Sequence, residues 1–248
     1  MQPSLPIPWS RREGRLSLAD RWGIALGAVR TRLAARRRGP FMPIELNARA
    51  LDSIVPPPDA VSRAVLGFAA DAQPAWLLQH ALRTYAWGRL LALNGDWAHE
   101  AKLLYAASLL HDLGLTSAAA EPADGCFAVR GARAAQQVLT QAGAGTTEAH
   151  RVACAIALHL DLTVGPQRGV EAHLLSAGAG LDVVGRRSRE LAPALKQAVL
   201  ARHPRLAMKR ELCACMRREA QAAPHTRMGL YVGRFGFLDL IEKAPFDE

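Results

Sequence analysis

The stretch 103-LLYAASLLHDLGLT-116 decides how the fold of this 248-residue chain is interpreted. Its first eight residues are almost all apolar, which predicts a buried helix, and Gly114 indicates where that helix ends. His111 and Asp112 lie at this end, where an imidazole and a carboxylate offer two metal ligands in adjacent positions. A single His-Asp pair is a weak motif, so its meaning depends on the other ligands that the fold brings to it.

Helical patterns lie on both sides of this stretch, and Asp59 is a good N-cap for the first of them. A helix capped by Thr146 or Thr147 runs to about residue 159, and another begins at 171 and meets the glycines at 178 and 180. Strand signals are almost absent, because only 125–129 reads as a short extended segment, and the tail after 222 reads as irregular. The remaining expected helices cover 60–70, 75–93, 98–113, 131–142, 189–202 and 207–222.

The composition supports the same fold class. Alanine and leucine dominate while aromatic residues make up 6% of the chain, which favours closely packed helices over sheets. We therefore expect an all-α bundle of irregular topology, forming one domain over 43–248 with its motifs between 75 and 190.

The positive charge is concentrated in an N-terminal arm, residues 1–42. Residues 1–41 hold nine arginines and two acidic residues, a net charge of +7, and the remaining 22 basic and 20 acidic residues leave +2. The main domain is thus nearly neutral, which argues against a specific nucleic-acid partner. We expect the arm to be disordered or to form one basic amphipathic helix over 17–35 that contacts an acidic surface. Met42 offers a second start, which would make the arm dispensable.

The cysteines and the hydropathy of the sequence predict a cytoplasmic protein. No apolar run approaches the roughly 18 residues that a membrane-spanning helix needs. Acidic residues interrupt any export signal after Ser10-Arg11-Arg12. The four cysteines lack zinc-knuckle spacing, so we expect reduced thiols in a cytoplasmic protein: Cys126, Cys154, Cys213 and Cys215.

Two further residues are candidates for the ligand set of His111 and Asp112. His80 lies in the preceding predicted helix, and consecutive helices joined by a short turn pack antiparallel, which brings it near His111. Asp182 lies in an apolar, glycine-rich stretch where an unpaired carboxylate is costly to bury, so a cation or a metal must compensate it. Two imidazoles and two carboxylates suit one divalent metal, zinc above all, with iron or manganese as alternatives.

The order His80…His111-Asp112…Asp182 resembles the H…HD…D signature of the HD-domain superfamily, an all-helical fold of metal-dependent hydrolases. Within it, five local stretches resemble the cyanamide hydratase-like branch: 80-HALRTY-85, 109-LLHDLGLT-116, 126-CFAVRGA-132, 155-AIALH-159 and 178-GAGLDV-183. The resemblance implies that His80, His111, Asp112 and Asp182 bind zinc and that His159 faces the substrate. The chain departs from the branch at Ala81, where serine is usual, and at Ala128, where an acidic residue is usual.

The resemblance also implies a reaction, the conversion of cyanamide to urea or a related hydration of a small nitrile-like molecule. In this hypothesis the metal and Asp112 activate water, and His159 supplies the proton to nitrogen. Arg83 pairs with a site carboxylate or forms a purely structural ion pair, and Thr116 contacts the substrate or caps a turn.

Two other functions stay open at this stage. One is an HD-domain phosphohydrolase acting on nucleotides or phosphate esters, although Leu115 stands where such enzymes often carry a lysine. The other is a non-catalytic sensor or scaffold that keeps the fold. A homo-oligomer is compatible with each of these functions. His150 and His173 do not extend the ligand pattern regularly, and we expect them at the surface.

Overall fold

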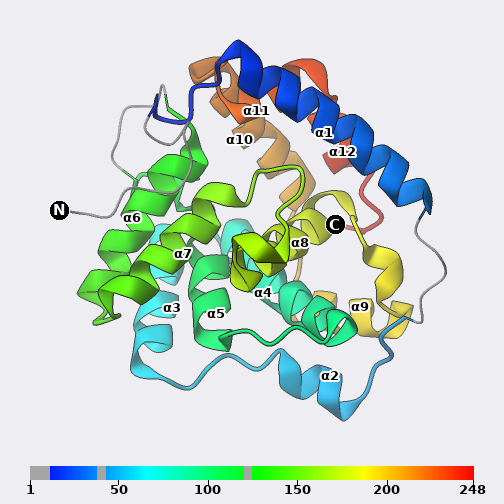
Figure 1. Cartoon of the computed structure of the whole chain (residues 1–248). Helices are drawn as coiled ribbons and strands as arrows, with labels where there is room; N and C mark the ends of the chain where they lie inside the picture. Colours follow the sequence, from blue (N-terminus) through cyan, green and yellow to red (C-terminus); the bar gives the residue numbers. More distant parts are fainter. Residues whose placement is uncertain (1–11, 38–42, 120–124) are drawn as a thin grey trace.

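The computed structural model describes residues 12–37, 43–119 and 125–248, and within them the fold is all-α, as the sequence predicts (Figure 1). The only extended pairing among the described residues is an isolated parallel bridge between Ile44 and Leu191. The α-helices, in chain order, are α1 (Leu18–Arg37), α2 (Ala48–Ser53), α3 (Ala60–Ala72), α4 (Ala75–Gly95), α5 (Ala101–Leu110), α6 (Phe127–Gln141), α7 (Thr146–Leu158), α8 (Val170–Val184), α9 (Pro193–Arg202), α10 (Met208–Ala222), α11 (Arg227–Arg234) and α12 (Phe237–Glu242).

Three helices, α4, α5 and α8, occupy the interior of the bundle, and the others surround them (Figure 1). Every residue of α5 from 103 to 110 is buried, which confirms the interpretation of that apolar run. The first turn of α3 is capped as predicted, because the Asp59 carboxylate accepts a hydrogen bond from the Ser62 amide at 2.9 Å.

The crossing of α4 and α8 depends on glycine. A Cβ at Gly178 would overlap the carbonyl oxygen of Thr84 and lie 3.0 Å from the Gly88 nitrogen. The two backbones therefore approach more closely than any larger side chain would permit. This close approach brings His80, two turns before Gly88 on α4, to the same level as Asp182, one turn after Gly178 on α8.

The helix expected over 98–113 is shorter and spans Ala101–Leu110, and four further predictions about individual segments are wrong. The segment 125–129 is not extended, because α6 begins at Phe127 and its first six residues are all buried; short apolar runs do not distinguish a strand from a buried helix. The helix α8 continues through the glycines at 178 and 180 instead of stopping there. Neither threonine caps α7: the Glu148 carboxylate accepts from the amide of Gly145, the residue before the helix.

The fourth error concerns the tail after residue 222, which forms α11 and α12. Gly236 adopts a φ of 62°, which lets the chain turn between these two short helices. Met228, Tyr231 and Ile241 carry their apolar surface into the core. The sequence pattern concealed these helices because each is shorter than three turns.

The N-terminal helix over 17–35 is confirmed as α1, but only part of its apolar surface is covered. Leu18, Trp22, Leu26 and Val29 are each more than half exposed, while Ile24 packs against the main core.

The segment before α1 is also attached to the rest of the fold. Glu13 pairs with Arg133 on α6, and its carbonyl oxygen accepts a hydrogen bond from the Cys126 amide at 2.8 Å. Glu13 and Ile24 therefore contact the main body of the fold.

All four cysteines are free thiols, as predicted. In the described part of the chain, no helix has both the length and the hydropathy to cross a membrane.

Candidate metal centre

Two neighbouring helices bring three predicted ligands together. His80 lies on α4, and His111 and Asp112 follow directly after α5, where the chain turns into the short 3-10 helix Leu113–Leu115. Gly114 permits this turn to press against α6, because a Cβ there would overlap the carbonyl oxygen of Phe127. The position of the His-Asp pair is therefore set by contacts between two backbones.

His80, His111 and Asp112 form a compact, buried group. One ligand atom from each lies within 4.8 Å of the others, and all three residues are at most 6% exposed. The His80 Nε2 atom lies 3.1 Å from His111 Nε2 and 3.5 Å from Asp112 Oδ2. The His111 Nε2 atom lies 3.2 Å from the same carboxylate oxygen.

The hydrogen-bond partners of the imidazoles fix which nitrogen carries the proton. His111 Nδ1 lies 2.8 Å from the carbonyl oxygen of Ser108, which can only accept, so Nδ1 is the donor. His80 Nδ1 lies 2.7 Å from an Asp182 carboxylate oxygen and donates in the same way. Both neutral rings therefore present a bare Nε2 lone pair to Asp112 and to each other.

Two bare nitrogens at 3.1 Å repel each other unless a cation lies between them. Two nitrogen ligands of a tetrahedral zinc are about 3.3 Å apart, given Zn–N bonds of about 2.0–2.1 Å. The donor set therefore fits a divalent metal.

Without a metal, a proton can take the same place. Burial lowers the pKa of His80, but its contacts with Asp112 and Asp182 outweigh burial and raise that pKa overall. Burial likewise opposes ionisation of Asp112, yet the neighbouring His111 and His80 hold its pKa well below the ordinary value. The centre is therefore built to hold positive charge, either a proton or a metal.

Asp182 is placed differently from the expectation based on the resemblance, because it is not part of this ligand group. Its Oδ1 accepts from Arg83 Nε at 2.8 Å and from Trp87 Nε1 at 2.8 Å. Its Oδ2 accepts from His80 Nδ1 at 2.7 Å and from a second Arg83 nitrogen at 3.0 Å. Asp182 thus lies behind His80 and fixes the orientation of its ring, as carboxylates do for many metal-binding histidines.

The spacing of residues on α4 indicates this arrangement, although the His-Asp motif alone does not. Arg83 and Trp87 follow His80 at three and seven residues on α4, so all three side chains share one face of that helix. Burial alone would raise the pKa of Asp182, but the charge of Arg83 outweighs it and holds that pKa well below the ordinary value. Arg83 also donates to the carbonyl oxygens of His203 and Pro204, so it is both the partner of a site carboxylate and a structural tie.

His159, the residue after α7, lies beside the group on its open side. Its Nε2 atom lies 3.6 Å from Asp112 Oδ1, and its Nδ1 donates to the carbonyl oxygen of Ile156 at 2.6 Å. Burial, together with the nearby His111, lowers the pKa of His159 to about 3. The resting ring is therefore neutral with a bare Nε2, so His159 has to take up a proton before it can supply one.

Thr116 is not among the described residues that line the cavity at this site. Its hydroxyl donates to the carbonyl oxygen of Leu113 and accepts from the Ala118 amide, so it caps a turn. His150 and His173 also lie elsewhere, His150 beside Cys154 and His173 against the Trp97 ring.

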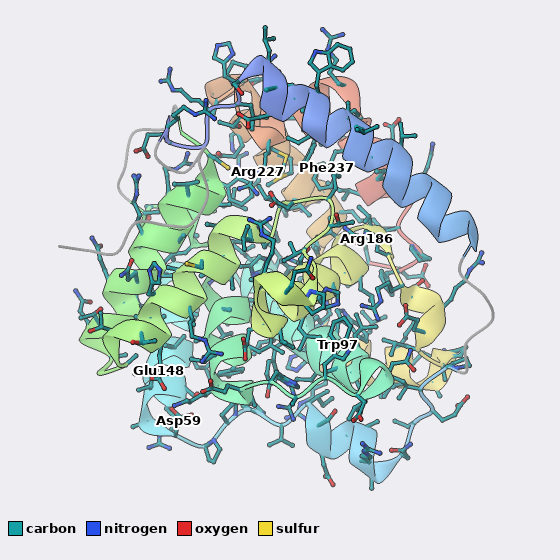
Figure 2. The ribbon with its side chains drawn as sticks, in the orientation of Figure 1. Asp59, Trp97, Glu148, Arg186, Arg227 and Phe237 are labelled. Carbon is teal, nitrogen blue, oxygen red and sulfur yellow. The ribbon has the colours of Figure 1, made fainter. Side chains whose placement is uncertain are left out.

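A cavity of about 550 Å³ opens from the three histidines His80, His111 and His159. Its far walls come from α1, α8 and the helices α10 to α12. Figure 2 labels two of the lining residues, Phe237 on α12 and Arg186 after α8. Sequence reasoning missed these walls, because only the tertiary fold brings the two ends of the chain to the motif.

No protein-family model matches this sequence, and no curated protein matches it. The likeness to the HD-domain superfamily therefore rests on the sequence motif alone.

Proposed function

We propose that this chain is a metal-dependent hydrolase or hydro-lyase of HD-domain type that adds water to a neutral nitrile-like or amide-like carbon. One observation carries the proposal: the His80, His111 and Asp112 ligand atoms converge at the buried end of the cavity. The motif order supports the HD-type assignment, and cyanamide is the first substrate to test. Zinc is the metal best suited to this nitrogen-rich ligand set, with iron and manganese as alternatives.

The residues of the chain have separable roles in this proposal. His80, His111 and Asp112 would hold the metal, which when bound lowers the pKa of a coordinated water to about 7. Asp182 and Arg83 keep His80 in the tautomer that leaves Nε2 free. His159, whose Nε2 is bare, accepts a proton from water and returns it to the substrate nitrogen. Addition of water to a nitrile carbon in this way gives an amide, with all atoms of the water retained.

The cavity argues against the phosphohydrolase alternative. Among the described residues that line it, Arg186 is the one arginine and there is no lysine. Phosphate esters are usually held by several cationic groups or metals. The scaffold alternative predicts no catalysis, but it does not explain why three ligand atoms converge at the end of a cavity.

Metal content and turnover test the proposal together. We expect about one zinc per chain after loading and gel filtration, and release of product amide from cyanamide or a larger nitrile. His111→Ala should lose both the metal and the activity. His150→Gln is the matched control, because His150 is a half-buried histidine outside the site, and it should retain both. A wild-type protein that binds no metal, or a loaded protein active only on nucleotides, would contradict the proposal.

A further inference from the structure

We infer that the substrate of this site is a neutral molecule with an extended apolar part, and that its reacting polar group lies at one end. The position of the reacting polar group rests on the proposed function. The apolar part of the substrate is inferred from the cavity. It goes beyond the small substrate that the motifs suggest.

The volume of the cavity is too large for cyanamide alone. Cyanamide has three non-hydrogen atoms, and at about 30 Å³ per water-sized group it would occupy about 90 Å³. The cavity of about 550 Å³ would be mostly unfilled. Its size lies in the range of about 300–1,000 Å³ that is typical of sites for larger organic ligands.

The side chains of the metal centre gather at one end of the cavity. His80, His111, Asp112 and His159 lie there, and the walls beyond them are mainly alkyl and aromatic side chains, such as Met216, Phe235 and Phe237. The second carboxylate in the wall, Asp161, is already paired with Arg227 at 2.8 Å and Arg168 at 3.0 Å. A ligand that fits this distribution has one polar end and an uncharged, apolar remainder.

The exposed rim of the cavity also carries apolar side chains. Val29 on α1 and Leu240 on α12 both line the cavity, and they are 54% and 49% exposed. Arg186, labelled in Figure 2, is also exposed and lines the cavity. Its side chain lies over Gly180. Val29 and Leu240 therefore offer apolar surface to a molecule that enters between α1 and α12.

Alkyl hydroxamic acids of increasing length provide a direct test, because the hydroxamate binds zinc and the chain probes the apolar walls. We would measure the Kd of acetohydroxamic, butanohydroxamic, hexanohydroxamic and octanohydroxamic acids for the zinc-loaded full chain by calorimetry. Each added methylene should tighten binding about fourfold, the factor that corresponds to about 0.8 kcal/mol per buried methylene. A Kd that does not change from the shortest to the longest acid would overturn the inference.

Two glycine variants locate the effect. A side chain at Gly180 projects toward the flexible end of Arg186, whose Cδ lies 3.3 Å from the added Cβ. Gly180→Leu should therefore fold, leave acetohydroxamic acid binding unchanged, and weaken octanohydroxamic acid binding at least tenfold. Gly67→Leu on α3 is the matched control, because Gly67 is an exposed helical glycine with no atom near the added Cβ, and it should change neither Kd. Equal effects of the two variants would overturn the inference.

The same series separates this inference from the proposed function. If the metal assignment fails, acetohydroxamic acid will not bind, but affinity will still rise with chain length. If the apolar substrate is wrong, the short acid will bind and chain length will have no effect. On His111→Ala we expect loss of the short acid and retention of the dependence on chain length.

Discussion

Replacing Asp182 by asparagine distinguishes a carboxylate that orients His80 from one that binds the metal. Asp182→Asn keeps the shape of the side chain but removes the charge that faces Arg83 and the Nδ1 proton of His80. Loss of such a supporting group typically weakens metal binding about 10- to 100-fold. Asp112→Asn removes a ligand itself, and we expect it to abolish stoichiometric zinc binding.

The same substitution has a predictable effect on folding. Arg83 is fully buried, and without its partner its charge is uncompensated, which costs about 3–5 kcal/mol. Domains are typically stable by about 5–15 kcal/mol, so the variant should remain folded in the cold with a much lower Tm. Among the described residues the ion-pair partners of Asp112 are histidines, which can lose their proton, so Asp112→Asn should lower the Tm of the metal-free protein less.

Competition with a chromophoric zinc chelator at pH 7.5 measures the affinities, and circular dichroism confirms that each variant is folded. The expected order is wild type, then Asp182→Asn, then Asp112→Asn with no measurable site. If folded Asp182→Asn loses zinc as completely as Asp112→Asn, Asp182 is a ligand and the positioning role is refuted.

Three further predictions concern the backbone contact at Gly114, the protonation of His80 and the α1 wall of the cavity. Gly114→Ala should lower both the free energy of unfolding in urea and the zinc affinity, because the added methyl overlaps the Phe127 carbonyl oxygen; unchanged values would show that the backbone contact is unimportant. The raised pKa of His80 means that the metal-free site holds a proton to higher pH than an ordinary histidine, and zinc must displace it. Zinc affinity should therefore fall as pH decreases through that pKa, and calorimetry in buffers of different ionisation enthalpy should detect proton release; a pH-independent affinity would contradict this. Deletion of residues 1–37 removes the α1 wall of the cavity and should weaken octanohydroxamic acid binding at least tenfold; unchanged binding would show that α1 is not part of the site.

The sequence predicted the helices that have a strong apolar pattern, and it predicted the candidate metal ligands that those helices carry. The apolar run ending at His111 and Asp112, and the long helix carrying His80, are both present. Their meeting could be expected because short connections make neighbouring helices antiparallel.

The role of Asp182 could not be read from residue order alone. The order His80…His111-Asp112…Asp182 specifies which residues approach each other but not which atoms are already satisfied. Arg83 and Trp87 occupy one oxygen of Asp182, and this depends on the close approach of α4 and α8 at Gly88 and Gly178. Likewise, the cavity walls from α1, α11 and α12 depend on contacts between the two ends of the chain.

Anomalous diffraction at the zinc edge from crystals of the zinc-loaded protein tests the central claim most directly. We predict one strong peak within bonding distance of His80 Nε2, His111 Nε2 and Asp112, with Asp182 still paired to Arg83. No peak at this group, or a peak bound by Asp182 after its ion pair with Arg83 has broken, would contradict the account.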